Sequence, residues 1–187
     1  MIMEQNSAQK NMWNTAGKAG LFLGLASTAY LFITQAIGQA ELPAFLNSIL
    51  GFVLWAAKFV GCIWIMKIFM KRYVSENPDS TNSDTFKLGT AMALLSAIVY
   101  SAAAFANVSF ISADTIVEQT DLMIQLMAPM MDSNSLAQID KVMEKLPQIT
   151  FFSNLIYCFF YGTILSFIIS RYIPSRNPFA NNTSEEW

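Results

Sequence analysis

Four long apolar runs, separated by shorter stretches that carry most of the charge, dominate the sequence. The runs cover residues 19–37, 45–70, 88–110 and 149–169. Each has about the 20 residues that a helix needs to cross about 30 Å of hydrocarbon. The pattern therefore predicts an all-α membrane protein, with four transmembrane helices packed as an antiparallel bundle.

The composition agrees with helices that face lipid. Hydrophobic residues make up 54% of the 187 residues and charged residues 13%, whereas about 25% of residues are charged in soluble domains. Four buried helices in a soluble protein of this length would lack a polar shell. The first run also has features of a signal peptide, because Lys10 and Lys18 precede it and residues 38–40 loosely resemble a cleavage site. It is longer than a signal-peptide core, so we expect an uncleaved span.

Basic residues flank the runs on one side, which predicts the orientation of the chain. Cytoplasmic connections are enriched in lysine and arginine, so both termini are predicted to be cytoplasmic in a multi-pass protein of the bacterial inner membrane. Because topology explains these bases, and the net charge is −2, we expect no nucleic-acid partner. The flanking bases are Lys10, Lys18, Lys67, Lys71, Arg72, Lys87, Arg171 and Arg176.

The connection between the third and fourth runs is acidic, with six carboxylates against two lysines, and it contains five of the eleven methionines. Its apolar residues recur at helical spacing on both sides of a break at 132–135. We expect an extracytoplasmic amphipathic hairpin over residues 112–147, resting on the outer ends of the spans or on the lipid interface. Its methionines fit either an adaptable binding surface or a simple core.

The remaining connections are polar and short. Residues 75–84 are rich in turn formers, and Ser83 or Asp84 is placed to cap the third span. Residues 1–175 are interpreted as a single four-span domain, and residues 176–187 as a flexible cytoplasmic tail.

The residue types that carry most catalysis are scarce. Histidine is absent, and Cys62 and Cys158 both lie inside predicted spans, where they are interpreted as small apolar fillers. The sequence has no glycine-rich phosphate loop, intramembrane carboxylate pair or serine elbow. We therefore expect no enzyme activity, no cofactor and no metal site.

Small residues recur at helical spacing in three of the spans. Such ladders let helix backbones approach closely in lipid. They fit either an oligomer interface or packing within one bundle, and packing within one bundle is favoured because three ladders are about what a compact bundle uses. The ladder residues are Gly17, Gly20, Gly24, Gly89, Ala93, Ala97, Gly162 and Ser166.

Lys58 interrupts the second run near its middle. A lysine at the bilayer centre costs about 2.5 to 3.5 kcal/mol, which the surrounding Leu, Ile, Val and Phe offset, so the span still inserts. The spans contain no carboxylate to pair with Lys58, so we hypothesise that its ammonium group donates to hydroxyl groups at the same depth. Those candidates are Thr28, Tyr30, Tyr100, Ser101, Tyr157 and Tyr161. The alternatives are a lysine that snorkels to lipid phosphates and an inert polar pin.

Several stretches carry a family resemblance. They are WNTAGKAGL at 13–21, KRY at 71–73, TFKLG at 85–89 and the Met-rich connection before the fourth span. The chain resembles the bacterial family known as domain of unknown function 4199, whose members are small four-span membrane proteins. The resemblance extends to about Arg176 and implies the fold and the membrane location, without an established activity.

Three function classes remain open. The leading hypothesis is a non-enzymatic accessory component of an envelope assembly, which acts through the acidic hairpin and the small-residue faces. The second is a small-solute or anion transporter or channel that uses Lys58, although the halves show no internal repeat. A membrane enzyme is third. The expected partners are the lipid bilayer and a membrane protein or a second copy of the chain.

Overall fold

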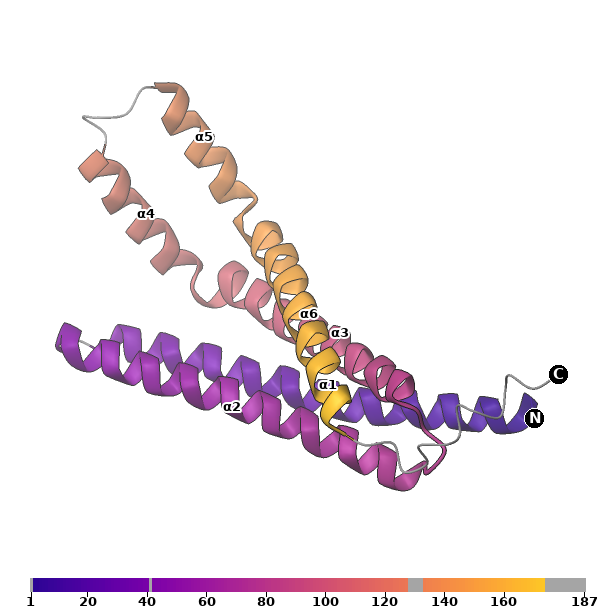
Figure 1. Cartoon of the computed structure of the whole chain (residues 1–187). Coiled ribbons are helices and arrows are strands. Elements are labelled where there is room, and N and C mark those ends of the chain that lie inside the picture. Colours follow the sequence, from indigo (N-terminus) through magenta and orange to yellow (C-terminus); the bar gives the residue numbers. More distant parts are fainter. Residues whose placement is uncertain (1, 41, 128–132, 174–187) are drawn as a thin grey trace.

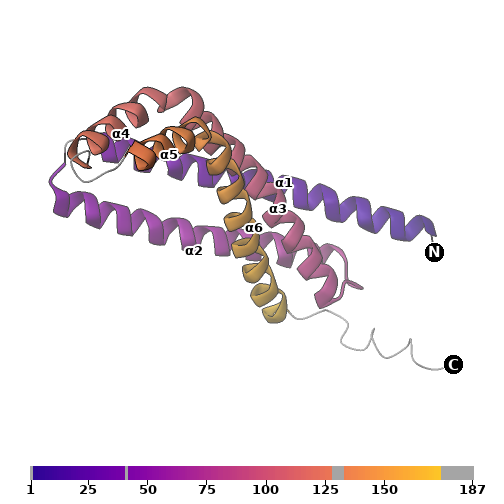
Figure 2. The same ribbon diagram turned by 90° about the horizontal axis from the view of Figure 1, so that it is seen from above.

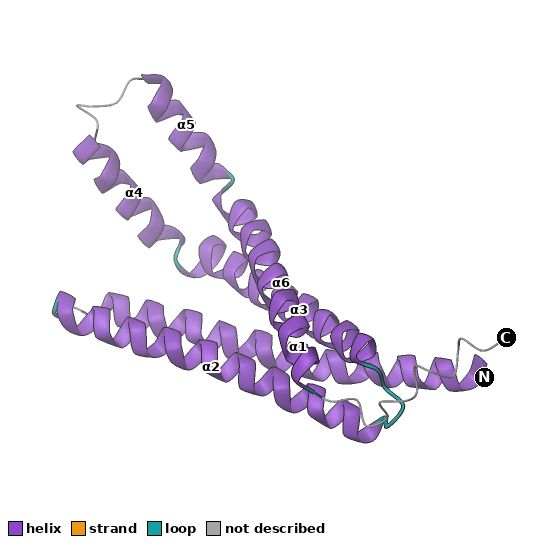
Figure 3. Ribbon diagram, viewed as in Figure 1, coloured by secondary structure: helices purple, strands orange, loops and turns teal. Residues whose placement is uncertain are grey.

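The computed structural model describes residues 2–40, 42–127 and 133–173, and these residues are almost entirely helical, without a strand. A short π-helical segment, η1 (Asn107–Ile111), follows the third helix. Figures 1 and 3 show the helices in chain order: α1 (Ile2–Gln39), α2 (Ala44–Glu76), α3 (Asn82–Ala106), α4 (Ala113–Met127), α5 (Ser133–Glu144) and α6 (Leu146–Tyr172).

Four helical segments are long and apolar enough to cross a membrane. They are Lys10–Gln39, Ala44–Glu76, Asn82–Ile111 and Leu146–Tyr172. Each contains one of the predicted runs and extends it at both ends. The prediction of an all-helical chain with four possible membrane spans is therefore confirmed.

The central helix of the bundle is α3, which packs along α1 on one side and α6 on the other. The second helix, α2, packs mainly on α1 and touches α3 and α6 at few points. Figures 1 and 2 show that α2 and α6 cross, so they come together near one end and separate beyond it. This divergence shapes the site described below.

The largest group of buried apolar side chains lies where α2 ends and α3 begins. Met70, Leu88 and Met92 are fully buried there. On α2, by contrast, no residue before Met66 is buried. We call this the closed end; it consists of Ala16, Ala19, Leu23, Met66, Met70, Tyr73, Val74, Leu88, Ala91, Met92, Ile169 and Ile173.

Thr81 caps α3, so the helix begins before the cap predicted at Ser83 or Asp84. The Thr81 hydroxyl accepts a hydrogen bond from the Asp84 backbone N–H at 3.3 Å. Asp84 Oδ2 accepts one from the Thr81 N–H at 3.1 Å. This is a capping box, which requires a side-chain acceptor three residues after the cap, and of these three registers only that of Thr81 supplies one. Asp84 takes part as the third helical residue.

The other end of α3 is joined to α1 by polar side chains. Gln35 Nε2 donates to the Ser112 hydroxyl at 2.7 Å, and that hydroxyl donates to Asn107 Oδ1 at 3.2 Å. Asn107 and Ser112 are buried, so these bonds satisfy groups that lipid cannot hydrate. They hold α1 against α3 while α2 and α6 diverge.

Both helices of the connection, α4 and α5, lie within residues 112–147, and α4 has no buried residue. Their contacts with the rest of the described chain are concentrated at η1 and α6. Figure 1 shows them extending beyond the ends of α3 and α6, so they do not rest on the ends of α1 and α2. Placement at the lipid interface stays a prediction. Asp132 in the predicted break and the tail 176–187 lie outside the described residues.

Candidate functional site

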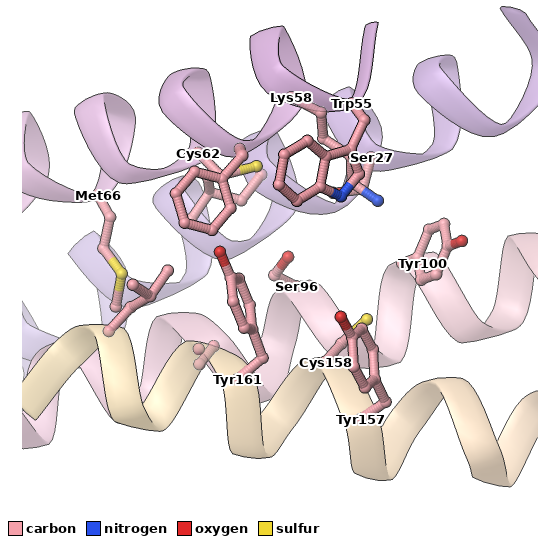
Figure 4. Close-up of a pocket in the computed structure, with 15 residues that line it drawn as sticks. Ser27, Trp55, Lys58, Cys62, Met66, Ser96, Tyr100, Tyr157, Cys158 and Tyr161 are labelled. Carbon is pink, nitrogen blue, oxygen red and sulfur yellow. The ribbon is translucent and has the colours of Figure 1, made fainter. Parts of the chain in front are cut away.

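A cavity of about 260 Å³ lies beside the closed end, surrounded by α1, α2, α3 and α6. Figure 4 shows side chains from all four helices directed into it. The labelled lining residues are Ser27 on α1, Trp55, Lys58, Cys62 and Met66 on α2, Ser96 and Tyr100 on α3, and Tyr157, Cys158 and Tyr161 on α6.

The cavity has an apolar floor and a more polar opposite part. Leu23 and Met66 belong to the buried core and Leu165 packs against it, so these three side chains form the floor. Lys58 lies eight residues before Met66 on α2, which corresponds to about 12 Å along a helix axis. Figure 4 shows Met66 at one end of the cavity, and Lys58 with Tyr100 toward the other.

Two aromatic rings hold the ammonium group of Lys58. Its Nζ lies 4.6 Å from the ring centroid of Tyr30 and 5.0 Å from that of Tyr100. At these distances a cation is attracted to the negative face of the ring. Among the described residues, the contacts of Lys58 are therefore ring faces rather than the hydroxyl oxygens that the sequence suggested. The side chain points into the bundle.

Of the other candidate residues, Thr28 and Ser101 do not join this group. The Thr28 hydroxyl donates to the Gly24 carbonyl of its own helix at 2.9 Å, a bond that threonine commonly makes within a helix. Ser101 is fully buried but does not line the cavity. Residues at the same depth can lie on different faces of their helices, so depth alone did not predict which side chains meet Lys58.

Within the described spans, the positive charge of Lys58 has no carboxylate at its own depth. In the four candidate spans, acids occur only at the helix ends, as Glu76 and Asp84. The ring faces stabilise the cation but leave its charge uncompensated. A negatively charged group that enters the cavity would therefore meet an unpaired cation in surroundings of low polarity.

Tyr161 contributes an enclosed hydroxyl for which the described residues offer no hydrogen-bond partner. Its ring stacks with that of Tyr157, with centroids 6.2 Å apart, and lies 6.0 Å from the ring of Phe59 on α2. An enclosed hydroxyl without a partner costs about 1 to 3 kcal/mol. A polar atom of a ligand would satisfy it.

The cavity opens sideways, between α2 and α6. Trp55 on α2 is 54% exposed and Tyr157 on α6 is 68% exposed, although both line the cavity. The two helices make few contacts with each other. The surrounding outward faces carry Phe52 and Ile156, both exposed, so the opening lies on an apolar surface.

Most of the small ladder residues lie where two spans of this chain meet. A Cβ atom added to Gly24 would lie 2.6 Å from Cβ of Val99, and one added to Gly162 would lie 2.5 Å from Cβ of Ala93. Gly20 faces Leu95 in the same way and Gly89 faces Ser166, while Ala97 is fully buried. Gly17 differs, because an added Cβ would meet no atom of the described residues within 4 Å.

Sequence reasoning did not assign Ser27, Ser96, Cys62 or Cys158 to the site, although all four line the cavity. A signal was present at all four positions. Cys62 follows Lys58 by one helical turn, and Ser96, Ser27 and Cys158 each precede a candidate tyrosine by three or four residues. Each therefore lies on the same helix face as a candidate residue.

Comparison with known proteins identifies a family. The model of the family described as "Protein of unknown function (DUF4199)" matches residues 18–172. The chain belongs to this family. The part that matches the DUF4199 model includes every residue that lines the cavity, from Leu23 to Leu165. No curated protein and no solved structure matches the chain. The geometry of the cavity therefore determines which chemistry this DUF4199 site can support.

Proposed function

We propose that this chain is an integral membrane protein that binds a small anionic molecule in the cavity around Lys58, without catalysing a reaction. The observation that carries the proposal is the uncompensated ammonium group between Tyr30 and Tyr100, directed into the bundle. An inert polar pin would not require a cavity beside it. A snorkelling lysine would extend toward the membrane surface.

The free energy of placing Lys58 inside the bundle is consistent with a charge that is kept for binding. A lysine at this depth costs about 2.5 to 3.5 kcal/mol. Each ring contact returns about 0.5 to 2 kcal/mol, so the charge is tolerated without being neutralised. An anion held against Lys58, with a hydrogen bond to the Tyr161 hydroxyl, would satisfy a cation and a hydroxyl for which the described residues offer neither a carboxylate nor a hydrogen-bond partner.

The proposal includes an orientation in the bacterial inner membrane. Lys71, Arg72 and Lys87 are exposed next to the closed end, which the positive-inside rule assigns to the cytoplasm. The four spans would then alternate in direction with both termini inside, and α4 and α5 would form the outer hairpin. The cavity would be closed toward the cytoplasm, which fits a binding site better than an open channel.

The direct test is ligand-dependent stability of the purified full-length chain in mild detergent. We expect small organic carboxylates to raise its apparent Tm and amines of matching size to have no effect, because only the anion pairs with Lys58. The shift should disappear in Lys58→Leu and persist in Lys58→Arg. Lys67→Leu, on the same helix but exposed, is the matched control. Equal shifts in the wild type and in Lys58→Leu would contradict the proposal.

A second candidate function, the accessory role in an envelope assembly, is favoured by one observation. Leu122, Met123 and Leu126 on α4 are all more than half exposed, and none of the residues of α4 is buried. Amphipathic helices that leave an apolar face uncovered commonly place it on a partner or on the membrane interface.

Native mass spectrometry of protein extracted in mild detergent tests this second candidate. A stoichiometric protein partner that is lost in Leu126→Glu, but kept in Gln125→Glu, would support it. Gln125 is the exposed neighbour of Leu126 on α4, so the pair of variants separates the apolar contact from added charge. A clean monomer in both the wild type and the variants would count against the accessory role.

A further inference from the structure

The shape of the cavity narrows the class of ligand. We infer, resting on the proposed anion site, that the ligand is a single-chain amphiphile, with a carboxylate head at Lys58 and an apolar chain toward Met66, and that it enters from the lipid between α2 and α6.

The closed end gives the direction of the ligand. Beyond Met66 the helices are joined by fully buried side chains such as Met70 and Met92, so the cavity does not continue through the protein. The part next to this core is formed by Leu23, Met66 and Leu165. A charged group at this floor would lose its hydration without a partner, whereas an apolar chain would fill it.

The distance between the floor and Lys58 sets the length of the ligand, and the cavity volume sets the number of its apolar chains. Lys58 and Met66 are about 12 Å apart along the helix axis, so a ligand with its head at Lys58 needs an extended apolar part to reach the floor. The volume of about 260 Å³ is just below the about 300 to 1,000 Å³ of most small-molecule sites. One medium-length chain fits this space, and a two-chain phospholipid does not.

The position of the cavity opening indicates the route by which the ligand enters. Trp55 and Tyr157 line the cavity while more than half of each side chain is exposed, and they lie on α2 and α6, the two helices that separate. At the depth of these residues the exposed surface of a membrane span faces hydrocarbon. A ligand that uses this opening must therefore dissolve in the membrane, which favours an amphiphile over a hydrated inorganic anion.

The two cysteines of the chain provide a test with native groups. Cys62 and Cys158 are the only cysteines, and both line the cavity, so a ligand that fills it should slow their alkylation by N-ethylmaleimide. Intact-mass measurement of the full chain in phospholipid vesicles follows the reaction, and Cys62→Ala and Cys158→Ala assign it to each thiol. The ligands are the carboxylates from acetate to decanoate, with decylammonium as the cation of matching chain.

We expect protection to strengthen with chain length, by about fourfold in concentration for each methylene group that the floor accepts. Longer carboxylates also dissolve better in the vesicle membrane, and this effect is the same for the wild type and for Lys58→Leu. Decanoate should therefore protect the thiols of the wild type at a concentration at least tenfold lower than it needs for Lys58→Leu. Leu165→Trp, which fills the floor, should abolish the dependence on chain length, whereas Ile164→Trp should not, because Ile164 is 59% exposed. Leu165→Phe provides a smaller change if the tryptophan variant fails to fold.

The outcomes separate this inference from the proposed function. If acetate protects the thiols as well as decanoate does, and only when Lys58 is present, the anion site stands and the amphiphile is excluded. If no carboxylate protects the wild type better than Lys58→Leu, both fail. The route is tested with the charged reagent sulfonatoethyl methanethiosulfonate. Faster labelling by this water-soluble anion than by the neutral reagent methyl methanethiosulfonate, with each rate taken relative to its rate with a free small thiol, would place the opening in water and overturn entry from lipid.

Discussion

The hydroxyl of Ser166 on α6 donates a hydrogen bond to the backbone carbonyl of Phe86 on α3, with 3.0 Å between the oxygens. Ser166 is fully buried beside Gly89, where α3 has no side chain to separate the two helices. The bond fixes the register of α6 against α3 near the closed end. Close backbone approach at small residues is the main way in which helices associate in lipid.

A methyl group at Gly89 should break this contact. The added Cβ would lie 2.8 Å from Cβ of Ser166 and would also overlap its hydroxyl oxygen, so α6 must shift or the hydrogen bond must be lost. We expect Gly89→Ala to destabilise the folded chain by about 1 to 3 kcal/mol. Equilibrium unfolding in mixed detergent micelles would measure the change.

The matched control is Gly17→Ala, because an added Cβ there meets none of the described atoms within 4 Å. Alanine favours a helix over glycine by about 1 kcal/mol, so this variant should be as stable as the wild type or more stable. Similar losses in both variants would mean that the α3–α6 contact is not as close as the structure shows.

The capping box at the start of α3 supports a second prediction. Asp84→Ala removes the acceptor for the Thr81 N–H and leaves the first turn with an unpaired donor. We expect a loss of about 1 kcal/mol in the free energy of unfolding. Asp79→Ala, in the same connection but exposed, should leave stability unchanged. Equal effects of the two substitutions would point to the loss of surface charge instead of the cap.

The spans could be predicted from the sequence because the bilayer imposes one strong constraint on them. A chain in hydrocarbon must satisfy its backbone hydrogen bonds internally, so a run of about 20 apolar residues leaves few alternatives to a helix. The sequence determined the ends of the helices less well. The start of α3 depended on one side-chain arrangement, Thr81 with Asp84, and the apolar pattern contains no information about it.

The sequence predicted at which depth of the bundle the candidate site lies, but not which side chains form it. Counting residues from the span ends placed Lys58 at the level of Tyr30 and Tyr100, and the structure brings these three together. Counting does not give the rotation of each helix, so Thr28 was included at the same depth although it bonds to its own helix. The cavity itself depends on the divergence of α2 and α6, which arises from packing between residues distant in sequence.

The proposed orientation gives a third prediction, testable by labelling in spheroplasts. In a chain whose native cysteines are replaced by alanine, Glu118→Cys on α4 should react with a membrane-impermeant thiol reagent. Asp79→Cys, between α2 and α3, should react only after the membrane is permeabilised. Both positions are exposed, so accessibility within the protein does not limit either reaction. The reverse pattern would place the closed end outside and invert the proposed topology.

The contacts of Lys58 give a fourth prediction, which separates ring faces from hydroxyl groups. The ammonium group lies over the rings of Tyr30 and Tyr100, so phenylalanine keeps the contact and leucine removes it. We expect Tyr30→Phe and Tyr100→Phe to bind carboxylates like the wild type. The leucine variants no longer hold the ammonium group in position for the anion, so they should bind more weakly, by at most about 30-fold, which corresponds to the upper value of about 2 kcal/mol for a cation–π contact.

Tyr157→Leu is the control for this comparison, because Tyr157 lines the cavity without contacting Lys58 as a ring face. Its loss should change binding less than the loss of either ring beside the cation. Carboxylate-dependent protection of Cys62 from alkylation measures all five variants in one assay. If the phenylalanine variants lose binding as fully as the leucine variants, the tyrosine hydroxyls hold the anion, and the rings serve only to fill space around Lys58.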